Sequence, residues 1–219
     1  MSFTSDTIAA LATPAGTAAL ALVRASGPQT GELTGKIFGG TLLPRAARHA
    51  EYFDVRGVLI DDVLFTYFAG PHSFTGEDTL EISCHGNPFI AQKILEDLLA
   101  RGCRQAEPGE FTKRAFLHGR MDLSQAEAVM DLIRARGDRA LAVANQQLRG
   151  ALGRQMDELI ARLIRILAQI EAYIDFPDED LPPEDRQLML RELDELLAGT
   201  GRLLATSHYG PCCGKASKP

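Results

Sequence analysis

The hydrophobic period of this sequence changes near residue 120, and that change limits the fold more than any other feature. Before it, short apolar runs with two-residue alternation are separated by Gly and Pro, as in strands and turns. After it, apolar residues recur at three- and four-residue spacing, as in long helices. We therefore expect an α+β protein, with a mixed-sheet α/β domain at 1–119, a partial helical domain at 120–210 and an aberrant tail at 211–219.

The first part contains apolar runs that predict four strands and two helices. The strands are expected at 8–13, 18–24, 63–68 and 79–84, and the helices at 29–38 and 88–101, with Gly102 ending the second. In the last strand, Leu80 and Ile82 fall on one face and Glu81 on the other.

The second part predicts helices from residue 124 onward. Ser124 and Glu127 fit a capping box at the first helix start, and Gly137, Gly150 and Gly153 are expected to bend or divide the helical stretch. Pro177 is expected to end one long helix, and a last helix is expected at 184–205.

An apolar seam at heptad spacing runs along the long helix. Its residues are Leu152, Met156, Leu159, Leu163, Ile166, Ile170 and Tyr173. Such a seam is typical of a bundle core, but two or three helices bury one poorly. From 155 to 200 the chain has twelve acidic and four basic residues, so its polar faces are acidic. We expect an incomplete α-helical bundle with exposed apolar surface.

Charge and cysteine content exclude several classes of protein. A net charge of −6 argues against a chain that binds duplex nucleic acid by counterion release. We expect no secretion signal and no membrane span, because no apolar run is long enough. The four cysteines form no disulfide framework, and reduced thiols in the cytoplasm fit them best.

Three charged residues are candidates for a binding site, although each also has a structural explanation. Glu81 could accept two hydrogen bonds from a guanidine-like edge such as that of a pterin, or it could be a solvated residue on the wet face of a sheet. Arg24 ends an apolar run and could anchor an anionic or carbonyl group, whereas Arg120 alone reads as a surface arginine. His85 is better explained by a turn than as a general base.

Two long motifs resemble those of one family. The segment PGEFTKRAFLHGRMDLSQAEAVMDLI at 108–133 and the segment GPHSFTGEDTLEISCHG at 70–86 are similar to signatures of the MnmE (TrmE) tRNA-modification GTPases. DTIAALATP at 6–14 and IDFPDE at 174–179 match as well, so the resemblance covers about residues 6 to 210.

The resemblance implies a fold, a cofactor and partners. The family's N-terminal domain is similar to folate-binding aminomethyltransferase domains, binds 5-formyltetrahydrofolate or another tetrahydrofolate derivative, and forms a homodimer. With the flavoprotein MnmG, the family modifies C5 of the tRNA wobble uridine by adding an aminomethyl or carboxymethylaminomethyl group. Carried onto this chain, the folate contacts fall on Arg24, Glu81 and Arg120. The catalytic residues stay unknown at this point, and no metal ligand is expected.

The family's GTPase domain is expected to be missing. Its binding of GTP, Mg²⁺ and K⁺ needs a phosphate-binding loop, and the nearest segment, 210–216, has the wrong spacing and Ala216 in place of Ser or Thr. Codon degeneracy allows the tail at 211–219 to be an out-of-frame version of the family's LLREGxK segment. Whether the chain alone is an enzyme stays open.

Three hypotheses follow from these observations. The chain is a folate-binding module of a tRNA-modification enzyme, a dimerisation scaffold without folate affinity, or a stand-alone folate-dependent one-carbon transferase. The third would use Cys212 or Cys213 as a nucleophile.

Overall fold

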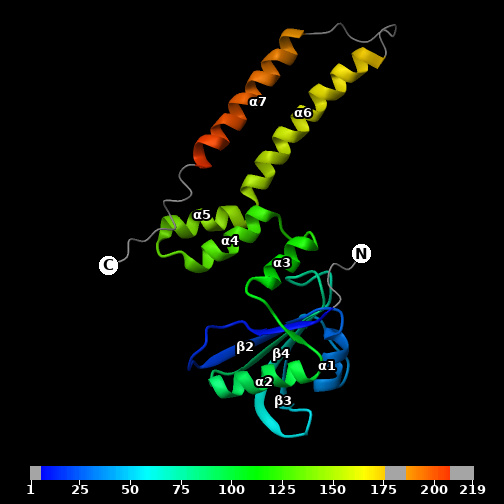
Figure 1. Ribbon diagram of the computed structural model, residues 1–219, viewed down its shortest axis with the longest axis vertical. Coiled ribbons are helices and arrows are strands. Elements are labelled where there is room, and N and C mark those ends of the chain that lie inside the picture. Colours follow the sequence, from blue (N-terminus) through cyan, green and yellow to red (C-terminus); the bar gives the residue numbers. More distant parts are fainter. Residues whose placement is uncertain (1–5, 176–185, 208–219) are drawn as a thin grey trace. The chain divides into compact units, whose positions relative to one another are not determined.

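The computed structural model describes residues 6–175 and 186–207 of the 219-residue chain (Figure 1). The chain divides into two compact units, Met1–Ala126 and Glu127–Pro219. The predictions for Pro177, Cys212, Cys213 and the tail fall outside the described residues.

The first unit is built on a six-stranded mixed sheet, in agreement with the sequence prediction. Its strands are β1 (Ile8–Leu11), β2 (Leu20–Ser26), β3 (Ala47–Phe53), β4 (Leu59–Phe68), β5 (Thr79–His85) and β6 (Arg104–Gln105). The strand order is β3-β4-β5-β2-β1-β6. Neighbouring strands are antiparallel except β1 and β6, which are parallel. Strands β3 and β6 were absent from the sequence prediction.

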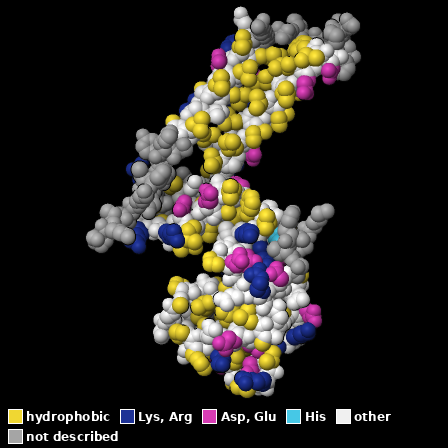
Figure 2. Space-filling view, viewed as in Figure 1, with side chains coloured by type: hydrophobic (Ala, Val, Ile, Leu, Met, Phe, Trp, Pro, Cys, Tyr) yellow, Lys and Arg dark blue, Asp and Glu magenta, His cyan; other side chains and the backbone are white. Residues whose placement is uncertain are grey.

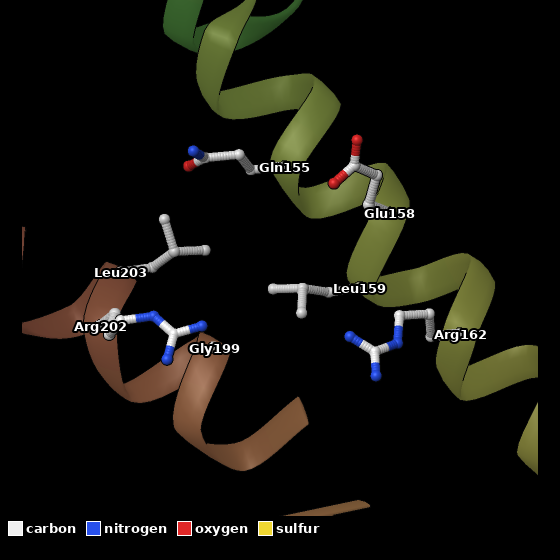
Figure 3. A pocket seen from close by; sticks show the side chains of 7 residues that line it. All are labelled: Gln155, Glu158, Leu159, Arg162, Gly199, Arg202 and Leu203. Carbon is white, nitrogen blue, oxygen red and sulfur yellow. The ribbon is translucent and has the colours of Figure 1, made fainter. Parts of the chain in front are cut away.

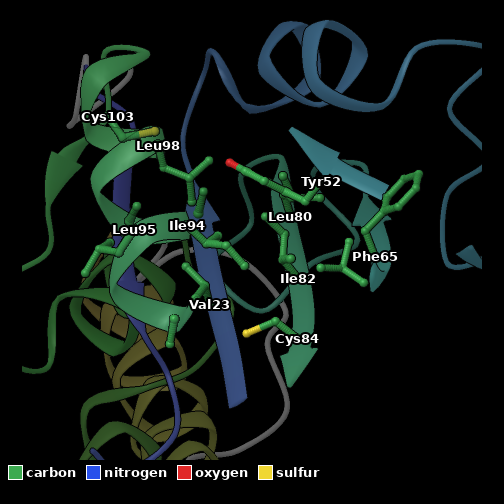
Figure 4. Packing of buried hydrophobic residues seen from close by; sticks show 14 of the residues in the cluster. Val23, Tyr52, Phe65, Leu80, Ile82, Cys84, Ile94, Leu95, Leu98 and Cys103 are labelled. Carbon is green, nitrogen blue, oxygen red and sulfur yellow. The ribbon is translucent and has the colours of Figure 1, made fainter. Parts of the chain in front are cut away.

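Helices α1 (Thr30–Phe38) and α2 (Pro88–Ala100) contribute to one hydrophobic core with the sheet. Figure 4 shows Ile94, Leu95 and Leu98 of α2 packed against strand residues that include Val23 and Ile82. The strand residues come from alternate positions, because successive side chains of a strand point to opposite faces. Both helices therefore cover the same face of the sheet.

The opposite face of the central strands carries the candidate residues. Glu81 pairs with Arg24 of β2 on one side and Thr66 of β4 on the other. Leu80 and Ile82 are fully buried while Glu81 is partly exposed, so the alternation predicted for this strand is confirmed. Leu64, which shares this face through its pairing with Ser83, is 51% exposed.

Helix α3 (Glu110–Leu117) completes the first unit, and α4 (Leu123–Arg134) begins within it. The cap of α4 differs from the prediction. Asp122, not Ser124, is the capping residue: its Oδ1 accepts the backbone N–H of Gln125, and Gln125 Oε1 accepts the N–H of Asp122. The predicted capping box is therefore wrong by two residues. Asp and Ser cap equally well, and Asp122 and Gln125 have the same spacing as Ser124 and Glu127.

The second unit continues with α5 (Asp138–Leu148), α6 (Ala151–Asp175) and α7 (Arg186–Ser207). Gly137 is the N-cap of α5, and Gly150, with φ of 72°, separates α5 from α6. Gly153 lies inside α6 and does not divide it, contrary to the prediction. None of the described helices combines the length and apolar composition that a membrane crossing needs.

The apolar seam of α6 is largely exposed. Ile166 is 2% exposed, but Leu163 is 52% and Met156 45% exposed. Figure 2 shows hydrophobic side chains gathered along α6 and α7. The prediction of exposed apolar surface in an incomplete bundle is confirmed for the described residues.

Candidate functional site

Arg24 and Glu81 form an ion pair on the sheet face that α1 and α2 leave uncovered. The two residues are register partners in β2 and β5. Nε and Nη2 of Arg24 donate to the same oxygen, Oε1 of Glu81, at 3.0 and 2.6 Å. The side chains are 23% and 25% exposed, so both remain reachable from solvent. The pairing brings together two of the three residues selected from the sequence.

The second oxygen of the Glu81 carboxylate is left for another donor. Within the described part of the chain, Glu81 Oε2 accepts no hydrogen bond, while Oε1 accepts both bonds from Arg24. An ionised carboxylate offers about four lone-pair sites. Glu81 can therefore accept hydrogen bonds from a planar N–H edge while it stays paired with Arg24.

Two aromatic rings flank the guanidinium group of Arg24. Phe74 lies in the loop between β4 and β5, and Phe111 lies in the first turn of α3. The guanidinium carbon is 5.6 Å from the centroid of each ring. At such distances a cation is attracted to the ring quadrupole, so the rings restrain the orientation of Arg24. They also add apolar surface against which a flat ligand can pack.

Arg120 lies beside the same loop. Its backbone N–H donates to the carbonyl of Ala115 at 2.8 Å, which folds the chain back after α3. A Cβ on Gly76 would lie 3.3 Å from Cγ of Arg120 and 3.0 Å from Cβ of His118, so this segment packs closely on the loop. The Arg120 side chain is exposed, and no described contact joins it to Arg24 or Glu81.

Buried hydroxyl groups attach that loop to β2. Ser26 Oγ lies 2.7 Å from Thr75 Oγ1 and 3.3 Å from Thr79 Oγ1, and all three residues are at most 2% exposed. The Nδ1 atom of His118 lies 2.8 Å from the carbonyl oxygen of Thr75. The loop that carries Phe74 is thus bonded to β2 through Ser26 and to the end of α3 through His118.

A cluster of charged residues joins α3 to the segment before β1, to β6 and to the loop between β4 and β5. Arg114 is 1% exposed and bonds to carboxylates of Asp6, Glu77 and Glu110, and Arg104 bonds to Asp6 and Glu110 as well. Burial raises the pKa of Glu110, but hydrogen bonds from Arg104, the backbone of Glu107 and Arg114 outweigh it and lower the pKa to about 2. The carboxylate of Glu110 is therefore ionised at neutral pH.

His85 and the described cysteines form no reactive centre. His85 is the last residue of β5, and its Nδ1 lies 2.7 Å from Oδ1 of Asp61, which also accepts the His85 backbone N–H through its other oxygen. Burial raises the pKa of Cys84 and of Cys103 to about 11, which disfavours their reactive thiolates. No group of His, Cys, Asp and Glu in the described residues could hold a metal ion.

The helical unit contains a groove of about 470 Å³ between α6 and α7 (Figure 3). Its lining residues are Gln155, Glu158, Leu159, Arg162, Gly199, Arg202 and Leu203. A Cβ on Gly199 would lie 3.1 Å from Cδ2 of Leu159, so the two helices approach closely there. The groove contains none of the three candidate site residues, and we interpret it as a gap in an incomplete bundle.

Sequence reasoning missed the aromatic and buried charged residues around Arg24. Phe74 stands in a polar turn, and Phe111 starts a helix between polar residues. An aromatic residue among polar ones in such a segment could have indicated a contact with the candidate site. The four-residue spacing of Glu110 and Arg114 was also readable, but it predicts a surface ion pair and not a buried one.

The sequence matches family models along most of its length. Residues 7–120 match the model described as "GTP-binding protein TrmE N-terminus", and residues 123–214 match that of the "MnmE helical domain".

Curated relatives show the same similarity. The tRNA modification GTPase MnmE of Opitutus terrae is 60% identical over 205 residues, which are 94% of this chain and 45% of the relative. Its counterpart in Akkermansia muciniphila is 49% identical over 208 residues, 93% of this chain and 46% of the relative. The MnmE protein of Moorella thermoacetica is 45% identical over 215 residues, which are 94% of this chain and 46% of the relative. The chain therefore spans about 45% of the length of these relatives. The resemblance of segments 70–86 and 108–133 is confirmed, and the chain belongs to the MnmE (TrmE) family of tRNA modification GTPases.

Proposed function

We propose that the first unit binds a tetrahydrofolate one-carbon donor, either 5-formyltetrahydrofolate or another tetrahydrofolate derivative. The Arg24–Glu81 pair on the uncovered sheet face carries this proposal. Among the described residues, one oxygen of the Glu81 carboxylate accepts no hydrogen bond, and two aromatic rings lie beside Arg24. Glu81 would accept hydrogen bonds from the pterin N–H and amino groups. Arg24 and Arg120 would hold carbonyl or carboxylate groups of the ligand.

The residues present suit such a ligand in charge and in aromatic surface. A pterin is flat and presents several N–H donors on one edge, which suits a carboxylate next to aromatic surface. The bound folate would supply the one-carbon unit of the modification. The protein groups named here would bind and orient it, and Phe74 and Phe111 lie beside the guanidinium group of Arg24.

The wider role follows from the family. We propose that the chain forms the N-terminal part of an enzyme that modifies C5 of the tRNA wobble uridine in the cytoplasm. It would dimerise through residues 1–119 and act together with the flavoprotein MnmG, with residues 120–210 forming part of the helical domain. GTP, Mg²⁺ and K⁺ would be bound by a GTPase domain and not by the segments described here.

Calorimetric titration of 5-formyltetrahydrofolate into the chain tests the proposal. Glu81→Gln keeps the side-chain shape but removes the charge, and it should weaken binding about tenfold or more, because a charge-assisted hydrogen bond is lost. Glu51→Gln is the matched control, since Glu51 is an exposed strand glutamate of β3 away from the site, and it should leave affinity unchanged.

Two results would contradict the proposal. A folded wild-type dimer without folate affinity would favour the dimerisation scaffold. Equal loss of binding in both variants would mean that general charge, and not the Glu81 carboxylate, attracts the ligand. Sedimentation velocity of the same samples measures the dimer directly.

A further inference from the structure

The most deeply buried charge in the described residues lies outside the proposed ligand contacts. Arg114, in α3, has a side chain that is 1% exposed. Burying a guanidinium group costs several kcal/mol unless carboxylates and carbonyls surround it. The proposed folate contacts do not use Arg114, so its burial needs another explanation.

Arg114 connects three segments that are far apart in the sequence. Its Nη1 donates to the backbone carbonyl of Asp6 at 2.9 Å and to Oε2 of Glu77 at 3.1 Å. Its Nη2 donates to Oδ1 of Asp6 at 2.8 Å and to Oε1 of Glu110 at 3.1 Å. The segment before β1, the loop between β4 and β5, and α3 therefore all meet at one guanidinium group.

Two of these segments carry the rings that flank Arg24. Phe74 is three residues before Glu77 in the loop, and Phe111 follows Glu110 in α3. From Ala69 to Asp78 the loop has neither helix nor strand. Its position therefore depends on side-chain contacts and on a few backbone hydrogen bonds, such as that from Gly27 N–H to the carbonyl of Asp78. The ion pair between Glu77 and Arg114 joins the loop directly to α3, and Arg114 is bonded in turn to Glu110, the neighbour of Phe111.

We infer that Arg114 is the positioning residue of the site: it holds the loop of Phe74 and the helix of Phe111 at the spacing that encloses Arg24. This inference rests on the proposed function, because the role assigned to Arg24 is folate binding. Without Arg114, Glu110 would keep its ion pair with Arg104, but the ion pair that joins Glu77 to α3 would be lost. The loop would then be held less firmly against α3.

The chain offers a matched control on the other face of the sheet. Arg101, the C-cap residue of α2, bonds to Asp97 with the same four-residue spacing as Arg114 and Glu110, and the side chains of Arg101 and Asp97 are 17% and 3% exposed. Arg101 Nη2 also donates to the carbonyl of Phe53, so it too fixes a neighbouring segment. It contacts neither the loop at 69–78 nor α3.

The experiment compares Arg114→Gln and Arg101→Gln in the 219-residue chain, with circular dichroism to confirm folding. Amide hydrogen exchange should accelerate at 70–78 and 110–120 in Arg114→Gln only, and at 53–55 and 97–103 in Arg101→Gln only. Arg114→Gln should weaken binding of 5-formyltetrahydrofolate about tenfold, since the loop of Phe74 loses its ion pair with α3, and Arg101→Gln should not.

A double variant separates positioning from general destabilisation. If Arg114 acts through Glu77, then adding Glu77→Gln to Arg114→Gln should weaken folate binding little further, because the same link is already broken. Glu77→Gln alone provides the test if Arg114→Gln does not fold, and it should accelerate exchange at 70–78.

The outcomes distinguish the inference from the proposed function. Unchanged exchange at 70–78 in both Arg114→Gln and Glu77→Gln overturns the inference, whatever the wild-type chain binds. Accelerated exchange with unchanged folate affinity also overturns it, because the site would then not depend on the spacing. A wild-type chain without folate affinity overturns the proposed function, while local acceleration in Arg114→Gln would still support the role of Arg114 in holding the two rings.

Discussion

The ion pair of Arg24 and Glu81 joins β2 to β5 at the candidate site, and each of its side chains is about a quarter exposed. Because water screens such a pair, it contributes roughly 1 kcal/mol or less to stability. The alternation of β5 predicted that Glu81 lies opposite Leu80 and Ile82, and this is confirmed. The alternation could not predict that Arg24 is the direct register partner of Glu81, because strand pairing depends on the whole sheet.

Gly76 is a residue whose replacement should affect the site. Its φ of +80° is strained for any side chain, and a Cβ would lie 3.0 Å from Cβ of His118 and 3.3 Å from Cγ of Arg120. Gly76→Ala should therefore displace the segment that carries Arg120. We expect a loss of unfolding free energy above the ~1 kcal/mol of the backbone strain alone, together with weaker folate binding.

Gly57 provides the matched comparison for this prediction. Its φ of +79° is nearly the same, but a Cβ there would meet no heavy atom within 4 Å. Gly57→Ala should thus report the cost of the backbone strain alone and leave affinity unchanged. Chemical denaturation and calorimetric titration measure the two effects. Equal destabilisation by both substitutions would contradict the close packing of His118 and Arg120 on Gly76.

At the scale of helices and strands, the sequence predicts an element well when the contacts that form it lie close together in the chain. Helices α1 and α2 end within one residue of their predicted bounds, because capping and glycine signals are local. Strand β3 was missed: its sequence, ARHAEYF, has no β-branched residue, and among the described strands it pairs with β4 alone, as an edge strand. Strand β6 has two residues and exists through its pairing with β1.

The start of α4 gives a prediction at this scale. Asp122 accepts the backbone N–H of Gln125 and the hydroxyl of Ser124, whereas Ser124 caps no backbone group. Asp122→Ala should therefore destabilise the start of α4 by about 1 kcal/mol, and Ser124→Ala by clearly less. Hydrogen exchange at residues 123–126 measures local opening. A larger effect of Ser124→Ala would restore the capping box expected from the sequence.

At the scale of the whole molecule, the helical unit differs from the first unit in how it buries apolar residues. The first unit encloses a continuous core, but most of the seam of α6 faces solvent. The heptad spacing predicted where the seam lies. It could not predict which seam residue would be buried, because that depends on the position of α7.

Two seam substitutions should have opposite effects. Leu163, 52% exposed, should tolerate Leu163→Glu, and the charge should reduce both self-association and binding of the apolar dye ANS. Ile166, 2% exposed, should not tolerate Ile166→Glu, because burying an unpaired carboxylate there would separate α6 from α7. Sedimentation velocity, dye fluorescence and thermal unfolding measure these effects. A monodisperse wild-type chain that binds no dye would contradict the solvent exposure of the seam's apolar side chains.

The strand order of the first unit also determines when its site can form during folding. Arg24 and Glu81 are 57 residues apart, and β1 pairs with β6 across almost the whole unit. Of the strand pairs that the structure describes, the β3–β4 hairpin alone closes through a short turn, at 54–58. Because closing a longer loop costs more chain entropy before any contact compensates for it, we expect this hairpin to form early and the central β2–β5 pair late. On the ribosome, Arg24 would emerge well before its partner, and the ligand site would be completed only when nearly all of the first 120 residues are available.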